Sequence, residues 1–239
     1  MLSLAPYVAA HALPLLAGLI GLAALATSLL WRRAERRSLA FPAAAIALLA
    51  LTAFAVLACA PDVLTGFDLA LAEALRRSVS TTVLRASFAI TQLGNFTSLL
   101  AVGAVVALWL AMRRRWLDLA AWVAATAGNG LLNRLVKQLA ERGRPLHDHG
   151  LVLEPGWSFP SGHASGSLAV YGMFAWLLLR GLPPPARLPL LIASLSLVLL
   201  IGFSRVLLQV HYFSDVLAGF ALASAWLAIC IGAAERLRR

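Results

Sequence analysis

The chain has 239 residues, of which 61% are hydrophobic and 13% are charged, and its mean hydropathy is +0.85. A soluble domain carries about twice this charged fraction, so the composition excludes an ordinary globular enzyme and predicts an integral membrane protein. The formal net charge of +10 does not indicate a nucleic-acid partner, because most arginines lie in short runs beside apolar segments, as in the cytoplasmic flanks of membrane helices.

Seven apolar stretches approach the length that a helix needs to span a bilayer, which predicts an all-α, polytopic transmembrane helical bundle. They run over Pro6–Trp31, Leu39–Ala60, Phe88–Met112, Leu117–Leu139, His163–Leu179, Leu188–Phe203 and Tyr212–Ala233. The sixth stretch is short for a span, which leaves open an extension into Arg205–Val210.

Arginine runs fall at alternate ends of these stretches. They comprise Arg32, Arg33, Arg36, Arg37, Arg113 to Arg115, Arg180, Arg187, Arg236, Arg238 and Arg239. The positive-inside rule makes their side cytoplasmic, so the N-terminus and segments 61–87, 140–162 and 204–211 are expected on the outer side. We expect a bacterial inner (cytoplasmic) membrane protein whose outer side faces the periplasm or the cell exterior.

One outer segment has the pattern of an amphipathic helix. In FDLALAEALRR, helical spacing places Phe67, Leu71, Ala74 and Leu75 on one face, and Asp68, Glu73, Arg76 and Arg77 largely elsewhere. The segment is either an interfacial helix or an ordinary helical connection packed on the bundle.

The first polar cluster on the outer side is KQLAERGRP, from Lys137 to Pro145. If the helix continues, Lys137 and Arg144 lie on nearly the same face, because they are seven residues apart. The planar fork of Arg144 and the compact ammonium of Lys137 suit the oxygens of one phosphate. The alternative is that both snorkel from a helix end to the interface, and Arg134 and Arg142 are interpreted in that way.

The second cluster is FPSGH, from Phe159 to His163, directly before an apolar helix. Glycine permits a turn there, and the free N–H groups of a helix start let Ser161 and Gly162 form a cradle for an anion. His163 at its edge is suited to exchange protons with a leaving group. A plain turn and N-cap with an interfacial histidine is the alternative.

The third cluster is SRVLLQVHYFSD, from Ser204 to Asp215. His211 and Asp215 are four residues apart, so on a helix the carboxylate holds one ring nitrogen and leaves the other free to attack. Arg205 supplies a further cation, and Ser204 is a candidate hydroxyl donor. A helical salt bridge is the alternative, although an ionisable pair at the end of a membrane helix favours a functional site.

Together the three clusters describe one site for a tetrahedral dianion: three cations, directional donors and two histidines, where catalysis is mainly positioning and charge stabilisation. No metal or other cofactor is required, and the outer carboxylates show no recurring ligand spacing. His147 and His149 flank Asp148 and could bind a metal, but a solvated loop explains them equally well.

The motifs Lys137–(six residues)–Arg144–Pro145, Pro160–Ser161–Gly162–His163 and Ser204–Arg205–(five residues)–His211–(three residues)–Asp215 resemble those of the type 2 phosphatidic acid phosphatase superfamily. This superfamily also includes the vanadium haloperoxidases. All three motifs match in the expected order.

The resemblance implies a phosphohistidine intermediate on His211, oriented by Asp215, with His163 as general acid for the leaving group. It also implies a phosphate site made by Lys137, Arg144, Arg205, Ser161 and Gly162. Membrane members usually form a six-helix bundle, which suggests Leu39–Ala233 as the common core. Residues 1–38 are then an additional N-terminal helix with a basic cytoplasmic loop, and residues 39–239 the membrane phosphatase core.

We therefore expect a phosphatase that hydrolyses a lipid phosphate or diphosphate at the outer membrane face. Undecaprenyl diphosphate is favoured because the site is expected to face outward and the chain looks bacterial, while phosphatidylglycerophosphate, phosphatidic acid and lipid A remain open. Two further alternatives are a lipid phosphotransferase and a non-enzymatic phosphate-binding transporter. A vanadium-dependent oxidase is disfavoured, because a water-soluble oxidation does not need so many spans.

Overall fold

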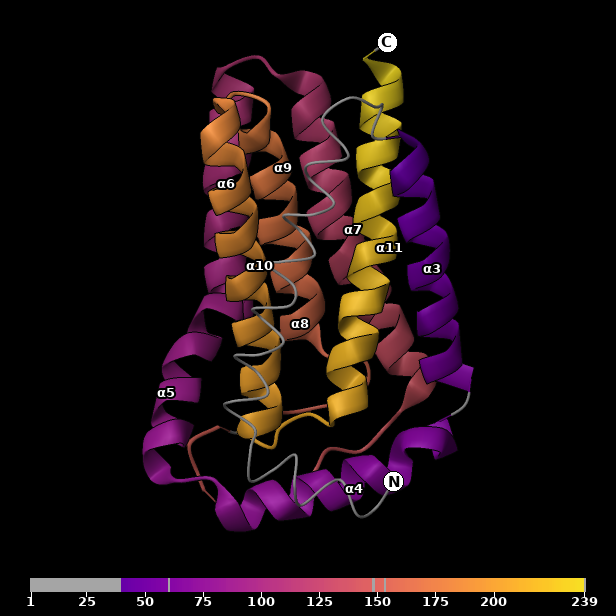
Figure 1. Ribbon diagram of the computed structural model, residues 1–239, viewed down its shortest axis with the longest axis vertical. Coiled ribbons are helices and arrows are strands. Elements are labelled where there is room, and N and C mark those ends of the chain that lie inside the picture. The colour runs from indigo at the N-terminus through magenta and orange to yellow at the C-terminus, as the bar shows by residue number, and fades with distance from the viewer. Residues whose placement is uncertain (1–39, 60, 148, 153, 239) are drawn as a thin grey trace.

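The computed structural model describes residues 40–59, 61–147, 149–152 and 154–238. Within these ranges, six long helical segments run side by side along the long axis of the molecule, and α4 crosses their lower end (Figure 1). The elements are α3 (Ala40–Cys59), α4 (Pro61–Ser78), α5 (Thr81–Thr91), η1 (Gln92–Gly94), α6 (Phe96–Met112), α7 (Trp116–Ala140), α8 (Gly162–Ser167), η2 (Leu168–Gly172), α9 (Met173–Leu179), α10 (Pro184–Leu207) and α11 (Phe213–Leu237). No strand occurs among these residues, and the predicted all-α bundle is confirmed.

The bundle has the surface of a membrane protein. Three helical segments of the described residues, Thr81–Met112, Pro184–Leu207 and Phe213–Leu237, are long and apolar enough to cross a membrane. Large apolar side chains such as Leu100 and Val105 of α6 are exposed, as expected for a lipid-facing surface. The first predicted helix, Pro6–Trp31, and the arginine run after it lie outside the described residues.

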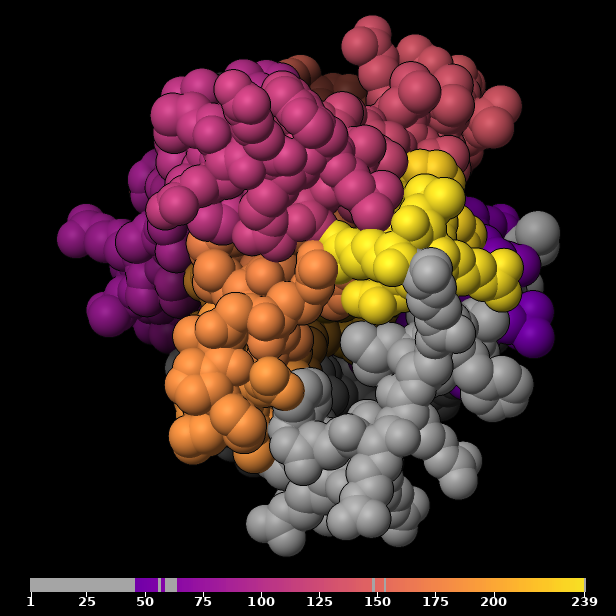
Figure 2. Space-filling model, turned by 90° about the horizontal axis from the view of Figure 1, so that it is seen from above, coloured from indigo at the N-terminus to yellow at the C-terminus, as the bar shows by residue number. Residues whose placement is uncertain are grey.

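The arginines that follow the helices gather at the upper end of the bundle. Asp118 of α7 forms ion pairs with Arg115 at 2.6 Å, with Arg180 at 2.9 Å, and with Arg238. Figure 2 looks onto this end, where the turn after α6, the start of α10 and the end of α11 lie together. The sequence pattern therefore placed these arginines correctly at one end.

Three of the predicted helices differ from the structure, and local sequence explains the differences in two of them. The third helical segment begins at Thr81, where the hydroxyl of Ser80 accepts from the backbone N–H of Val83. It is interrupted after Gly94, because the side chain of Asn95 caps a new helix, α6. The sixth is longer than predicted, since prolines in its first turn fit the free N-terminal positions of a helix. The fifth contains the π-helical stretch η2, which the apolar pattern did not indicate.

Helix α4 packs on the bundle through one apolar face. Leu71 and Leu75 are buried against Val206 and Leu207 of α10 and Val216 of α11. The prediction for Asp68 was wrong: it shares this buried face and is 1% exposed, because it lies one turn before Leu71. Glu73, by contrast, lies on the exposed side and binds Arg76 and Arg77.

Candidate active site

All the predicted site residues lie at the end of the bundle that α4 crosses. They come from the end of α7, the chain between α7 and α8, the start of α8, the end of α10, the turn after it and the start of α11 (Figure 1). The arginine-rich end is the opposite one, so the separation of site and arginines expected from the sequence is present.

His211 and Asp215 are close, but not for the reason the sequence suggested. His211 lies in the turn between α10 and α11, not on a helix, and Asp215 occupies the first turn of α11. The carboxylate folds back over the helix start and accepts from the backbone N–H of Tyr212 at 2.9 Å, which forms a capping box. This places Asp215 Oδ2 3.5 Å from His211 Nδ1.

The hydroxyl of Ser158, a residue that none of the three motifs includes, links the histidine to the carboxylate. Its Oγ donates to Asp215 Oδ2 at 2.5 Å and lies 3.2 Å from His211 Nδ1. The hydroxyl is therefore placed to accept from Nδ1–H while it donates to the carboxylate. Ser158 stands next to the FPSGH motif but outside it, and no spacing rule marked it.

The other ring nitrogen of His211 faces a cation. Arg144 Nη1 lies 3.2 Å from His211 Nε2. Because a guanidinium has no acceptor, Nε2 accepts in this contact and Nδ1 carries the proton. The contacts of His211 with Ser158 and Asp215 therefore leave its Nε2 lone pair directed toward the guanidinium of Arg144.

Lys137 and Arg144 converge, although the helix between them ends early. Helix α7 stops at Ala140, and Glu141 has a left-handed backbone with φ of 44°, so Arg144 leaves the helical face that the sequence suggested. Both side chains nevertheless bind the carbonyl oxygen of Trp157, at 2.6 Å from Lys137 Nζ and 3.2 Å from Arg144 Nη2.

Arg205 is 1% exposed and approaches the site from α10. Its guanidinium binds the hydroxyl of Thr91 at 2.8 Å and the carboxylate of Glu154, while its Nε has no hydrogen-bond partner. Glu154 lies in the outer segment 140–162, and the sequence assigned it no role. Its carboxylate binds the guanidinium of Arg205 as a negatively charged phosphate oxygen of the substrate would.

Ser161 forms the N-cap of α8 and adjoins α11. Its hydroxyl oxygen accepts from the N–H of Ala164 at 3.4 Å, and its own N–H donates to the carbonyl of Asp215 at 2.9 Å. The predicted anion cradle therefore loses the Ser161 N–H, and the N–H groups of Gly162 and His163 at the helix start remain for it. Gly219 of α11 permits this close approach, since a Cβ there would lie 2.6 Å from Ser161 O.

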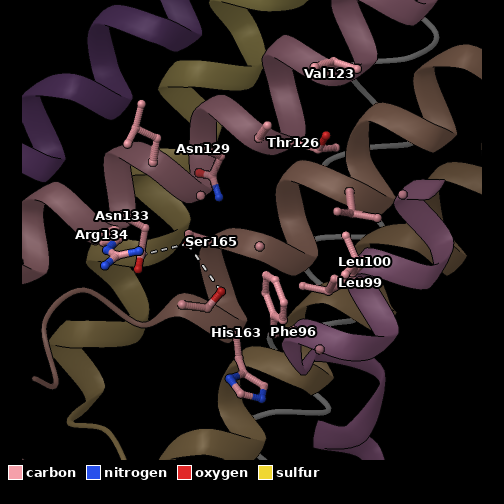
Figure 3. A pocket seen from close by; sticks show the side chains of 18 of the residues that line it. Phe96, Leu99, Leu100, Val123, Thr126, Asn129, Asn133, Arg134, His163 and Ser165 are labelled. Carbon is pink, nitrogen blue, oxygen red and sulfur yellow. Dashed lines mark hydrogen bonds between the residues drawn. The ribbon is translucent and has the colours of Figure 1, made fainter. Parts of the chain in front are cut away.

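His163 stands in the first turn of α8, within electrostatic range of Arg205, His211, Arg144 and Lys137. It also lines a groove of about 730 Å³ between α6, α7 and the α8–η2 segment. Figure 3 shows His163 at one end of this groove and Val123 toward the other. The histidine thus lies between the cation cluster and an apolar passage along the bundle.

Arg142 was interpreted as an interfacial side chain, and that interpretation was wrong. Its guanidinium donates to Asp215 Oδ1 at 2.7 Å and to Asp68 Oδ2 at 2.8 Å, and stacks over the ring of Tyr212 at 4.4 Å. Burial alone would lower the pKa of Arg142, but the carboxylates of Asp215 and Asp68 raise it above its usual value. The backbone N–H of Ser214 also donates to Asp68, at 3.1 Å, so α4 is tied to the start of α11.

The electrostatics of His211 favour its neutral form. Burial lowers the pKa of His211 from 6.5 to about 4, and Arg144 and Arg205 act in the same direction, while the Asp215 carboxylate opposes them. A neutral imidazole is the form that attacks as a nucleophile.

His149 is one of the two histidines that could bind a metal according to the sequence. Among the described residues, no group of three histidine, cysteine, aspartate or glutamate side chains is placed to hold one. Both ring nitrogens of His149 are engaged: Nε2 with the carbonyl of Leu208 at 2.8 Å, and Nδ1 with the N–H of Leu151 at 3.1 Å.

A family model described as PAP2 superfamily matches residues 118–239. The chain belongs to the PAP2 superfamily. The matched range contains all three motifs, from Lys137 to Asp215, and the resemblance inferred from them is confirmed.

Relatives of this PAP2 protein include named phosphatases. Phosphatidylglycerophosphatase B of Bacillus subtilis (strain 168) is 34% identical over 154 residues, which cover 63% of this chain and 74% of that protein. Lipid A 1-phosphatase of Rhizobium johnstonii (strain DSM 114642 / LMG 32736 / 3841) is 34% identical over 110 residues, 42% of this chain and 41% of that protein.

A solved structure has the same fold. The crystal structure of the first transmembrane PAP2 type phosphatidylglycerolphosphate phosphatase from Bacillus subtilis matches with a TM-score of 0.74 at 29% identity, and the match covers 81% of this chain and 98% of that one. This PAP2 protein is thus an integral membrane protein of the lipid phosphatase class, as the sequence predicted.

Proposed function

We propose that this PAP2 protein hydrolyses a membrane lipid phosphate through a phosphohistidine on His211. The observation that carries the proposal is the asymmetry of the His211 ring: Nδ1 faces Ser158 and Asp215, whereas Nε2 faces Arg144. One nitrogen is held by a carboxylate relay, and the other points its lone pair at the cations that would bind a phosphate.

In the first step, the Nε2 lone pair forms a bond to phosphorus while the bond from phosphorus to the lipid oxygen breaks. His163 gives a proton to that oxygen, so the lipid leaves as an alcohol or, from a diphosphate, as a monophosphate. In the second step, His163 takes a proton from water, the hydroxide attacks phosphorus, and the bond between Nε2 and phosphorus breaks. Lys137, Arg144 and Arg205 balance the charge on the phosphate oxygens in both steps, with Ser161 and the N–H of Gly162 beside them.

For the lipid, we favour a glycerophosphate lipid of the phosphatidylglycerophosphate type. Support comes from the Bacillus subtilis relatives and from the groove of about 730 Å³, which leads from His163 along α6 and α7 and can receive a hydrocarbon chain. Undecaprenyl diphosphate, favoured from sequence alone, is kept as the comparison substrate. We propose the bacterial inner membrane as the location, with the active site on the outer side, opposite the arginine-rich end.

The test uses purified, detergent-solubilised protein, release of free phosphate, and a panel of phosphatidylglycerophosphate, phosphatidic acid, lipid A and undecaprenyl diphosphate. We expect wild type to release phosphate without an added acceptor and His211→Ala to lose at least about a thousandfold in kcat. Wild type incubated with a ³²P-labelled lipid and quenched in alkali should also carry label that His211→Ala lacks. Undiminished release by His211→Ala would refute the mechanism, and release only with an acceptor would indicate a phosphotransferase.

A further inference from the structure

The groove beside His163 contains a row of polar side chains from one helix. Thr126, Asn129 and Asn133 of α7 all line it, and their spacing of three and four residues places them on one helical face. Much of the remaining lining is apolar, including Leu99, Leu100 and other side chains of α6 and η2. Figure 3 shows the row beside the groove, with Asn129 between Thr126 and Asn133.

Two of these three polar groups are satisfied within the protein. The hydroxyl of Thr126 donates to the carbonyl of Trp122 at 2.8 Å, one turn back on its own helix. Asn133 Nδ2 donates to the hydroxyl of Ser165 at 2.9 Å, which links α7 to α8.

Asn129 differs from both neighbours. It is 2% exposed, and its Oδ1 is buried without a hydrogen-bond partner. An amide in hydrocarbon surroundings without partners is costly, and an aliphatic side chain of similar size would avoid this cost. Its presence on the groove-lining face indicates a ligand that brings a polar group to this depth.

The distance of Asn129 from Lys137 along α7 indicates which part of a bound lipid would reach Asn129. It precedes Lys137 by eight residues on α7, which is about 12 Å along the helix axis. Arg134 lines the same groove between these two positions and is exposed. A phosphate bound at Lys137 would therefore be followed by a cation and then by an amide before the groove becomes apolar.

We propose that Asn129 is a specificity-determining residue that hydrogen-bonds the acyl-linkage region of a lipid, and so selects glycerolipid head groups over polyprenyl diphosphates. In phosphatidylglycerophosphate, a glycerol and a second phosphate separate the terminal phosphate from the acyl esters. Arg134 suits that second phosphate, and the Nδ2–H groups of Asn129 can donate to the ester oxygens beyond it, which only accept. A polyprenyl diphosphate has only hydrocarbon beyond its two phosphates, so it has no group there that could form a hydrogen bond with Asn129. The inference rests on the proposed function, because it takes the cleaved phosphate to lie at Lys137 and His211.

The experiment compares Asn129→Leu with Thr52→Val on α3, a residue outside the groove whose hydroxyl donates to the carbonyl of Leu48 on its own helix at 2.9 Å. We expect Asn129→Leu to raise KM for phosphatidylglycerophosphate about tenfold and to leave KM for undecaprenyl diphosphate unchanged, as the loss of one hydrogen bond predicts. Thr52→Val should change neither KM. Asn129→Leu should also raise the Tm of the ligand-free protein, because it removes an unsatisfied buried amide.

Equal losses on both lipids, or a lower Tm with reduced activity on both, would show that Asn129 is structural and would overturn the proposal, as would no change on either lipid. If wild type hydrolyses no lipid at all, the proposed function fails. Binding of non-cleavable phosphonate analogues of the two lipids then decides the role of Asn129: weaker binding of the glycerolipid analogue alone would support it, and any other pattern would refute it.

Discussion

Asp68 and Asp215 share the guanidinium group of Arg142, which donates to them at 2.8 and 2.7 Å. Asp68 belongs to α4, which crosses the end of the bundle, and Asp215 to the first turn of α11. The side chains of both aspartates are fully buried, so the shared cation balances two charges that are out of reach of water. Through this contact, α4 helps to fix the carboxylate that faces His211.

Asp68→Asn should lower kcat about tenfold to a hundredfold with little change in KM, since Arg142 would lose one of its two anchors and Asp215 would shift. Glu73→Gln on the same helix is the matched control, because Glu73 binds only exposed arginines. We expect the control to keep wild-type kcat. Steady-state kinetics with one lipid substrate, together with Tm, make the measurement; wild-type kcat in Asp68→Asn would contradict the positioning role.

The pKa of His211, lowered to about 4 by burial, predicts activity well into the acid range. The neutral imidazole attacks, so kcat/KM should fall only as pH drops toward about 4, once the ionisation of the substrate phosphate is allowed for. The Asp215 carboxylate favours the protonated ring of His211. Asp215→Asn should therefore shift the fall of kcat/KM at acid pH to still lower pH, in addition to reducing kcat. Profiles of kcat/KM between pH 3.5 and 8 test both statements. A fall of kcat/KM centred near pH 6.5, the ordinary pKa of histidine, would disagree with the burial of His211.

Gly94→Ala should impair both stability and turnover. A Cβ at this position would lie 2.3 Å from Ile201 Cγ2 and 3.2 Å from His163 Cδ2, so Ile201 or the imidazole must move. We expect a loss of about 1–3 kcal/mol in the free energy of unfolding and about a tenfold lower kcat.

Two further variants make this test specific to Gly94. Ile201→Ala in the Gly94→Ala background should restore part of kcat, because it removes the clashing methyl group. Gly103→Ala on α6 is the control for stability: its Cβ meets nothing within 4 Å, and alanine favours a helix. If Gly94→Ala has wild-type Tm and kcat, the packing around His163 is looser than these distances indicate.

Glu154→Gln should make the site bind phosphate analogues more tightly. Glu154 holds the guanidinium of Arg205 and places a negative charge where an anionic substrate must approach. Vanadate mimics the pentavalent state of phosphorus, so we expect it to inhibit wild type, and to inhibit Glu154→Gln at about fivefold lower concentration. Glu141→Gln, an exposed carboxylate of the same segment, is the control. Weaker inhibition of Glu154→Gln would instead mean that Glu154 orients Arg205 for the phosphate.

Activity should survive EDTA. Lys137, Arg144 and Arg205 supply the positive charge that a divalent ion provides in other phosphatases, so we expect unchanged phosphate release after chelation. The measurement is kcat before and after dialysis against EDTA. A loss that one divalent cation restores would assign a metal to the site.

The parts of the fold and site that could be predicted depend on short-range patterns. Hydropathy and arginine placement are local, and among the described residues they located the long helical segments and the polar end. The pairing of Asp215 with His211 was predicted through a wrong geometry: the sequence suggested one helical face, whereas a helix cap turns the carboxylate back. Sequence separation alone does not distinguish these two arrangements.

Contacts between distant segments could not be predicted. Arg142 meets Asp68, and Arg205 meets Glu154, through packing of helices and loops that no periodicity encodes. Ser158 was missed for the same reason, because it acquires its role only when the chain before α8 folds onto the start of α11.

At the end of the bundle opposite the active site, the ion pairs with Asp118 give three arginines a structural role in addition to their role in membrane topology. The positive-inside rule uses only their charge, which lysine would supply equally well. Arg115, Arg180 and Arg238 also clasp one carboxylate from three separate segments, and this requires the reach and planar donors of guanidinium groups. Membrane topology and folding stability can therefore be separated in this chain. Replacing these arginines by lysine should keep the orientation of the chain in the membrane and weaken the packing of the helices at this end.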